Sequence, residues 1–290
     1  MCGLTPCLPD PGGALAGGLS PGYPNNPAAI IRIAARTTVP CLRRNSALGM
    51  TLRPRHNPRL RDRDHEILEH VMRYRITTPE VLRQRFFPET DRTAVTKVTT
   101  RLCADEFLAS YPLYERHIYF TLGRRGAKVC GLTPSKVGPL GPQSLYREFG
   151  TLLFCCRSTP ERERIRFSQF QREFAPLVIG RLDASHYYVD RHQASDGKTI
   201  DRLGFIWVEG AGSVDHIVRT LRNDIIEPRR QVPEFRRRIE AGLFLIAVVT
   251  ISEDKRAQIR QALSGLVTPV FFRVAAVPEL IHLLPSLRNV

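Results

Sequence analysis

Residues 77–122 decide the fold of this chain and read TTPEVLRQRFFPETDRTAVTKVTTRLCADEFLASYPLYERHIYFTL. Thr77-Thr78-Pro79-Glu80 is typical of a helix start, because a hydroxyl side chain caps the helix and Pro fits its first turn. Asp91 caps a second helix in the same stretch. Two β-prone runs follow, Phe107–Leu113 and His117–Leu122, joined by a short turn. The stretch therefore predicts two helices and then a hairpin.

A further helix precedes this stretch. Apolar residues recur with helical spacing between Asp62 and Tyr74, at Ile67, Leu68, Val71 and Met72. Three helices followed by a hairpin, with a short second helix, are the plan of a winged helix-turn-helix. We expect this module over residues 62–135.

The third helix carries a polar and basic face that fits the major groove of DNA, which is about 12 Å wide. Arg and Thr side chains on this face can reach base edges, whereas Lys97, Arg124 and Arg125 can meet phosphates. Arg116, at the hairpin tip, can contact the DNA backbone or the minor groove. The expected DNA-binding residues are Arg92, Thr93, Thr96, Lys97, Thr100, Arg116, Arg124 and Arg125. The alternative is a three-helix protein-interaction module whose charged faces are only solvated.

The net charge favours a polyanionic partner. The chain of 290 residues has 43 Lys and Arg against 28 Asp and Glu, which gives a net charge of +15 and a sequence pI near 10.1. Such an excess indicates nucleic acid first and an anionic membrane surface second. The longest apolar run, Leu243–Ile251, is too short to span a bilayer. A merely basic soluble surface is the alternative.

Residues 1–49 have a composition typical of disorder, with seven Pro and seven Gly. Met50 is an alternative translation start. Residues 50–61 form a basic arm, which adds phosphate contacts beside a winged helix. The arginines of this arm and of its continuation are Arg53, Arg55, Arg59, Arg61 and Arg63. Seven cysteines, an odd number without paired metal-ligand spacing, indicate a reduced, cytoplasmic protein.

A second domain is expected over residues 143–290, after a linker at residues 136–142 that is rich in Gly and Pro. His186–Val189 and Leu203–Val208 read as the strands of an antiparallel hairpin, because Asp196-Gly197-Lys198 between them is a turn signature. Strands and helices then alternate to the end of the chain. This alternation predicts a mixed or parallel sheet with helices on its faces.

The order of these elements resembles the plasmid-associated replication-relaxation family. The resemblance rests on RDRDHEILEHVMRYRITTPEVLRQRFF, the helix ending TRLCADEFL, the segments LGRRGAKV and LYREFGTLLFCC, and the hairpin ending IWVEGAG. It covers about residues 60–285. It implies an α+β protein in which an N-terminal winged helix-turn-helix is followed by an α/β restriction-endonuclease-like domain with a mixed sheet.

The resemblance also implies where a nuclease site would lie. Asp183 fits the acidic position at the start of the hairpin's first strand, with Asp201 as a rival, and Glu209 fits the position at the end of the second strand. Two such carboxylates hold Mg²⁺, and a Lys activates water or stabilises charge. The third position, which requires an acidic residue or Lys, is Ala211, and the sequence places no Lys near it.

We therefore expect a cytoplasmic protein that binds double-stranded DNA and whose nuclease-like domain has lost catalysis. Arg219 or Arg222 could stabilise charge at this site, but Arg cannot act as a base. The expected role is in replication, mobilisation or transcriptional control of a mobile element, with no cofactor and no membrane partner. A Mg²⁺-dependent nuclease or nickase using Asp183 and Glu209 is the first alternative. A non-enzymatic interaction scaffold is the second, and a homodimer remains open.

Overall fold

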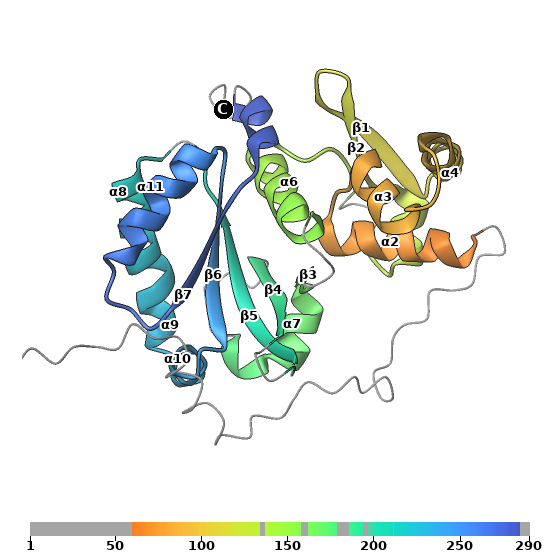
Figure 1. The fold of residues 1–290 in the computed structure, drawn as a ribbon. Coiled ribbons are helices and arrows are strands. Elements are labelled where there is room, and N and C mark those ends of the chain that lie inside the picture. Colours follow the sequence, from red (N-terminus) through yellow and green to blue (C-terminus); the bar gives the residue numbers. More distant parts are fainter. Residues whose placement is uncertain are drawn as a thin grey trace, which may run out of the picture. The chain divides into compact units, whose positions relative to one another are not determined.

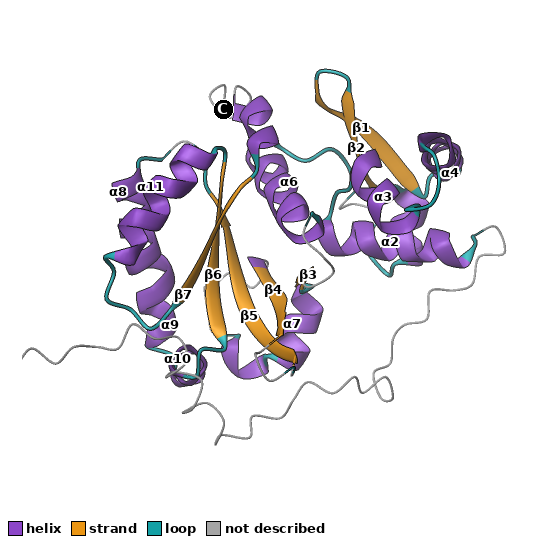
Figure 2. Cartoon of the chain, in the orientation of Figure 1, coloured by secondary structure: helices purple, strands orange, loops and turns teal. Residues whose placement is uncertain are grey.

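A computed structural model describes residues 60–133, 137–157, 162–178, 186–193, 197, 199–210 and 212–284. The protein is α+β, with a mixed five-stranded sheet and a separate two-stranded antiparallel sheet (Figure 1 and Figure 2). Residues 50–59 of the expected basic arm, Asp183 and Ala211 lie outside the described residues. Among the described helices, none combines the length and the apolar character that crossing a membrane requires.

Residues 60–133, here termed the helix–hairpin segment, begin with three helices and a hairpin. The elements of this segment are α2 (Asp62–Tyr74), α3 (Pro79–Phe86), α4 (Arg92–Ala104), β1 (Leu108–Tyr114), β2 (His117–Leu122) and α5 (Arg124–Val129). The strands β1 and β2 pair antiparallel. The predicted helices and the predicted hairpin are confirmed.

Local capping determines where α3 and α4 begin. Thr78 Oγ1 accepts a hydrogen bond from the Val81 N–H at 3.3 Å, and Asp91 Oδ1 accepts one from the Ala94 N–H at 3.1 Å. Both caps satisfy an N–H that the helix itself leaves free. Thr99 of α4 is buried although it is polar, because its hydroxyl donates to the Val95 carbonyl at 2.9 Å. A pattern of apolar residues does not reveal such a position.

Residues 137–284, here termed the α/β segment, contain the five-stranded sheet. Its principal elements are α6 (Pro142–Cys156), β3 (Arg162–Arg164), α7 (Phe167–Glu173), β4 (Tyr187–Gln193), β5 (Thr199–Val208), α8 (Val214–Thr220), α9 (Glu227–Arg230), α10 (Pro233–Glu240), β6 (Phe244–Thr250), α11 (Glu253–Ser264) and β7 (Phe271–Ala276). Short helical turns cover Ala175–Leu177, Leu221–Ile226 and Pro278–Leu283, the last of which is η5.

The sheet has the order β3-β4-β5-β6-β7. The first three strands pair antiparallel, and β5, β6 and β7 pair parallel. The predicted hairpin is confirmed, with Tyr187 opposite Phe205 and Gln193 opposite Thr199. The three-residue strand β3 was not predicted, because a run as short and charged as Arg-Glu-Arg has no strand signature.

Helices cover both faces of this sheet (Figure 2). One face packs its apolar side chains with those of α8, α10 and α11, including Ile217, Phe235 and Ile259. The other packs with α6, and Phe149 and Leu152 lie in that second cluster. The strand β6 is buried along its whole length because it lies between two strands and between two helical layers.

The core on the α6 side also takes in residues of the helix–hairpin segment. Tyr74, Ile76 and Val81 belong to the same buried cluster as Phe149 and Leu153. Because the helix–hairpin segment shares this apolar cluster with α6, we expect the two segments to unfold together.

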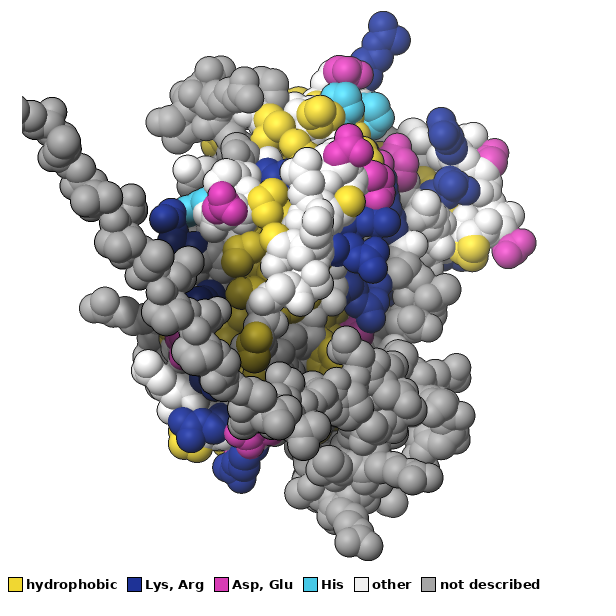
Figure 3. All heavy atoms as spheres, turned by 60° about the vertical axis from the view of Figure 1, so that its left-hand side comes forward, with side chains coloured by type: hydrophobic (Ala, Val, Ile, Leu, Met, Phe, Trp, Pro, Cys, Tyr) yellow, Lys and Arg dark blue, Asp and Glu magenta, His cyan; other side chains and the backbone are white. Residues whose placement is uncertain are grey.

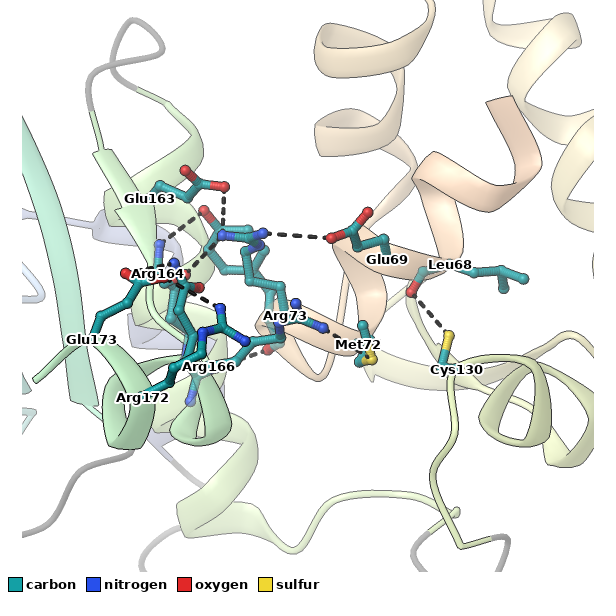
Figure 4. A network of polar contacts seen from close by, with 12 residues as sticks. Leu68, Glu69, Met72, Arg73, Cys130, Glu163, Arg164, Arg166, Arg172 and Glu173 are labelled. Carbon is teal, nitrogen blue, oxygen red and sulfur yellow. Dashed lines mark hydrogen bonds and ion pairs between the residues drawn. The ribbon is translucent and has the colours of Figure 1, made fainter. Parts of the chain in front are cut away.

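Polar contacts run beside this shared core. Figure 4 shows Arg73 of α2 reaching between Glu69 of its own helix and Glu163 of β3. Arg73 Nη1 also donates to the carbonyl of Arg164 at 3.3 Å. The guanidinium of Arg164 pairs in turn with the buried carboxylate of Glu148 on α6. A chain of charged groups therefore links α2, β3 and α6.

A buried histidine makes the stability of this region depend on pH. His70 Nε2 lies 3.1 Å from Thr77 Oγ1, and the imidazole packs against the rings of Tyr74 and Phe86. Burial, and to a smaller extent the positive charges of Arg85 and Arg73, lower the pKa of His70 from 6.5 to about 3. The folded protein therefore holds this imidazole neutral.

We expect the free energy of unfolding to decrease as the pH falls below 6.5. In that range the unfolded chain binds a proton at His70, whereas the folded chain does not bind it until the pH approaches 3. The loss is about 1.4 kcal/mol per pH unit, or about 2 kcal/mol between pH 7 and pH 5. Urea denaturation of the wild type and of His70→Gln at both pH values measures it. An equal pH dependence in the two proteins would contradict the prediction.

Candidate nucleic-acid interface

The exposed face of α4 carries the five side chains expected to read DNA. Val95, Thr99 and Leu102 are the residues of α4 that are buried. All five predicted residues, Arg92, Thr93, Thr96, Lys97 and Thr100, are exposed. A helix of 13 residues is about 20 Å long, which suits a helix that lies in a major groove.

The charge of this face is positive and largely uncompensated. The helix α4 contains no acidic residue. Arg101 is neutralised, because its Nη2 donates to both carboxylate oxygens of Asp64, at 2.7 and 2.8 Å. Within the described part of the chain, the side chains of Arg92 and Lys97 have neither an ion pair nor a hydrogen bond. These two cations are therefore available for a ligand.

The threonines on this face differ in how much hydrogen-bonding capacity they retain. The Thr96 hydroxyl donates to the carbonyl of Arg92 at 3.1 Å, so its proton is used inside the helix. Its oxygen can still accept a hydrogen bond. For Thr93 and Thr100 the described structure contains no side-chain hydrogen bond, which leaves both hydroxyls able to donate.

The hairpin lies between α4 and α6 (Figure 1). At its tip Arg116 is exposed, and Glu115 takes a left-handed conformation with φ of 48° that closes the turn. Tyr114, on the other side of Glu115, stacks on His282 of η5 with a ring separation of 4.6 Å. The tip is thus held by the α/β segment, while the Arg116 side chain points into solvent.

The two arginines after the hairpin have different environments. Arg124 is exposed, whereas Arg125 is half-buried with its guanidinium 4.7 Å from the centre of the Phe107 ring. The flanking glycines permit this turn, because a Cβ on Gly123 would lie 2.2 Å from the Glu106 carbonyl oxygen and one on Gly126 would lie 2.0 Å from that of Phe107. Of the pair, Arg124 is the better placed to meet phosphate.

One face of the molecule shows how other basic side chains are distributed. On the face shown in Figure 3, Lys and Arg side chains form separate groups, several of them beside Asp or Glu. At the described end of the basic arm, the backbone N–H of Arg61 donates to Asp64 Oδ2 at 2.9 Å, and the guanidinium of Arg63 lies 4.7 Å from the centre of the Phe87 ring.

Glu209, the residue expected at the end of the second strand of the nuclease-like hairpin, directly follows β5. Its N–H donates to the Val249 carbonyl at 2.8 Å, and its Oε1 accepts from the Gly212 N–H at 2.8 Å. The neighbouring Tyr146 hydroxyl is buried and has no hydrogen-bond partner among the described residues. Burial and the negative charge of Glu209 raise the pKa of this phenol. The Glu209 carboxylate therefore lies near a buried phenol hydroxyl that water does not reach.

A lysine does lie near this segment, although the sequence predicts none there. Lys255 Nζ, from the first turn of α11, donates to the carbonyl of Gly210 at 3.0 Å. Its backbone N–H is bonded to the capping hydroxyl of Ser252, which fixes the start of the helix. Sequence spacing could not reveal this lysine, because α11 reaches the end of β5 only through the parallel pairing of β5 with β6.

Asp201 is excluded as the partner of Glu209. It lies in β5 opposite Arg191, eight residues before Glu209, and a strand of that length separates the two by about 26 Å. Its carboxylate is 4.0 Å from Arg191 Nε, so it belongs to an ion pair. The first residue of β4, Tyr187, lies opposite Phe205 near the end of β5, and Asp183 precedes it outside the described residues.

The proposed arginine substitutes are not seen at Glu209. Arg219 is exposed, and its Nη2 lies 3.3 Å from Nδ1 of His216. Arg222 is exposed as well. Among the described residues, no group of three or more His, Cys, Asp or Glu side chains is arranged to hold a metal ion.

Comparisons with known protein families, with curated proteins and with solved structures found no match to this chain.

Proposed function

We propose that the helix–hairpin segment is a winged helix-turn-helix that binds double-stranded DNA, with α4 in the major groove. The observation that carries this proposal is the exposed face of α4, where Arg92 and Lys97 are unpaired within the described structure and the helix itself contains no acidic residue. Arg116 and Arg124 are exposed and add phosphate contacts. Arg125 contributes mainly by packing on Phe107.

We further propose that the α/β segment is restriction-endonuclease-like and that the protein acts in replication, mobilisation or transcriptional control of a mobile element. This follows the resemblance to the replication-relaxation family. It is supported by the three antiparallel strands β3, β4 and β5, which continue into the parallel strand β6, and by the helix α6 on one face.

A selection from random-sequence DNA with the full chain tests the DNA-binding function. The expected result is a recovered motif, bound with an affinity that falls steeply as the salt concentration rises, because bound phosphates release counterions. A motif with two half-sites would indicate a homodimer. The scaffold alternative predicts neither a motif nor salt-dependent DNA binding.

The described residues around Glu209 do not fit a Mg²⁺ site. Mg²⁺ requires near-octahedral oxygen coordination, and here one carboxylate oxygen already accepts from Gly212. The neighbouring Gly210 carbonyl accepts from the ammonium of Lys255, whose positive charge opposes a divalent cation. Lys255 favours the alternative of a nuclease or nickase, because it supplies a charge stabiliser that was not expected from the sequence pattern. The oxygen atoms available to bind Mg²⁺ do not favour that alternative.

We therefore expect the protein to leave DNA intact. Supercoiled and linear DNA, incubated with purified protein in Mg²⁺ or Mn²⁺, should show neither nicking nor cleavage on a gel. Nicking that is lost in both Glu209→Ala and Lys255→Ala, but kept in the exposed control Asp215→Ala, would overturn the prediction and establish the nuclease alternative.

A further inference from the structure

Three arginines surround a single buried carboxylate on one face of the five-stranded sheet. Asp190 of β4 is 1% exposed, and its cross-strand neighbours are Arg162 on β3 and Arg202 on β5. Directly opposite residues of antiparallel strands point to the same face of the sheet. Arg273 of β7 reaches the same carboxylate, with its Nη2 3.0 Å from Asp190 Oδ2.

The charges of this cluster do not balance. Arg162 Nε lies 3.5 Å from Asp190 Oδ1, so Asp190 pairs with two of the arginines. Arg202 has no carboxylate partner in the described structure, and its guanidinium lies 5.4 Å from the centre of the Phe271 ring. Burial and the charge of Arg273 lower the pKa of Arg202, while Asp190 opposes that shift. Three cations thus face one anion, an excess of two positive charges.

The opposite face of the same strands shows the contrast. There Arg191 of β4 pairs with Glu163 at 3.1 Å and approaches Asp201 at 4.0 Å. Because Arg73 also pairs with Glu163, two cations meet two carboxylates there, and the charges on that face balance. The imbalance around Asp190 is therefore particular to the α6 side of the sheet.

Polar atoms without partners also lie at the cluster. Tyr188 is fully buried, and its hydroxyl has no hydrogen-bond partner among the described residues. Tyr188 lies two residues before Asp190 in β4, so its side chain is on the same face of the sheet. Burial and the negative charge of Asp190 raise the pKa of its hydroxyl. The Nε of Arg202 is likewise buried without a hydrogen bond within the described structure. A donor buried without an acceptor costs free energy, which a bound oxyanion would recover.

The cluster is nevertheless open to solvent on one side. The side chain of Arg273 is 36% exposed and that of Arg162 is 15% exposed. Phe271, beside Arg202, is 41% exposed. Guanidinium groups present paired donors whose geometry matches a phosphate group, and a ligand could approach them from this side.

We propose that Arg162, Arg202 and Arg273 form a binding site for a phosphate group on the sheet face, with Asp190 holding the guanidinium groups of Arg162 and Arg273 in place. The site is independent of α4 and of the proposed DNA-binding function. The phosphate belongs either to a small molecule or to the backbone of a nucleic acid, and the two sources share the same recognition chemistry.

Calorimetric titration of the full chain with pyrophosphate tests the site. Saturable binding is expected, weakened about tenfold or more in Arg202→Gln and in Arg273→Gln, because each change removes a charge-assisted hydrogen bond. Arg191→Gln, on the opposite face, is the matched control and should bind pyrophosphate as the wild type does.

A second arm distinguishes the two sources of phosphate. In the Arg92→Ala/Lys97→Ala background, where the α4 face is disabled, a short DNA duplex that still binds and loses affinity in Arg202→Gln would identify nucleic acid. Pyrophosphate binding without duplex binding would identify a small molecule. The absence of saturable pyrophosphate binding, or binding unchanged in Arg202→Gln and Arg273→Gln, would overturn the proposal and leave the arginines with a structural role only. Urea denaturation of each variant checks that it folds.

Discussion

The double variant Arg92→Ala/Lys97→Ala is expected to lose most of the DNA affinity of the protein. Both side chains are exposed on α4, and neither has an ionic partner within the described structure. Neither charge takes part in an ion pair that stabilises the described fold, so removing both should leave the helix intact. The two residues should contribute to binding in different ways, one through phosphate contact and the other through base contact, and the single variants distinguish these contributions.

Lys97 is expected to meet phosphate. Its loss should lower the affinity for all DNA sequences alike and reduce the slope of log K against log salt by about one unit. Arg92, in the first turn of α4, is the better candidate for base readout. Its loss should cost about 1–3 kcal/mol on the preferred site and much less on unrelated DNA.

Fluorescence anisotropy of labelled duplexes at several salt concentrations measures both effects. Arg260→Ala, an exposed arginine on α11, is the matched control and should change the affinity little. Thermal melting checks that each variant is folded. Unchanged binding in the double variant would remove α4 from the interface and, with it, the proposed mode of DNA binding.

Replacing Glu148 by alanine is expected to destabilise the whole protein by about 3–5 kcal/mol. The Glu148 side chain is 7% exposed and that of its partner Arg164 is 5% exposed, so the pair is buried. Glu148 Oε1 also accepts from Arg75 at 2.9 Å, and Arg164 Nη1 donates to the Tyr74 carbonyl at 3.1 Å. Without Glu148, the buried guanidinium of Arg164 would lose the carboxylate with which it pairs.

The expected loss is a large part of the 5–15 kcal/mol by which domains are typically stable. Urea denaturation followed by circular dichroism measures it. The control is Glu227→Ala, which removes an ion pair to Arg230 in which both side chains are about half exposed, and should change stability by less than about 1 kcal/mol. Glu148→Leu/Arg164→Met, which removes both buried charges, should recover much of the stability. A loss below about 1 kcal/mol in Glu148→Ala would contradict the prediction.

Much of the secondary structure follows from the sequence. Thr78 and Asp91 cap the helices that they were expected to cap, and β4 and β5 pair antiparallel as the sequence predicts. The exposed face of α4 was predicted as well, because apolar and polar residues alternate there with helical spacing. The strand β3 was not predicted, because its pairing with β4, not its composition, makes it a strand.

For the candidate sites too, some residues were identified from the sequence and others only from the structure. The sequence identifies Arg92 and Lys97 as exposed cations, but only the structure shows that Arg101, on the same helix, is neutralised by Asp64 of α2. The lysine beside Glu209 comes from α11 and was missed. Asp201 was considered for the same site as Glu209, yet it lies at the other end of β5.

From the sequence alone follow the helix caps at Thr78 and Asp91, the apolar faces of the helices and the positive charge of the chain. Caps, turns and periodicity act between residues a few positions apart, so they can be read directly from the order of the letters. The tertiary structure alone decided which charges are paired, as at Glu148 and Arg164, and which are left in excess, as around Asp190. These partners are far apart along the chain, and only the order and direction of the strands bring them within hydrogen-bonding distance.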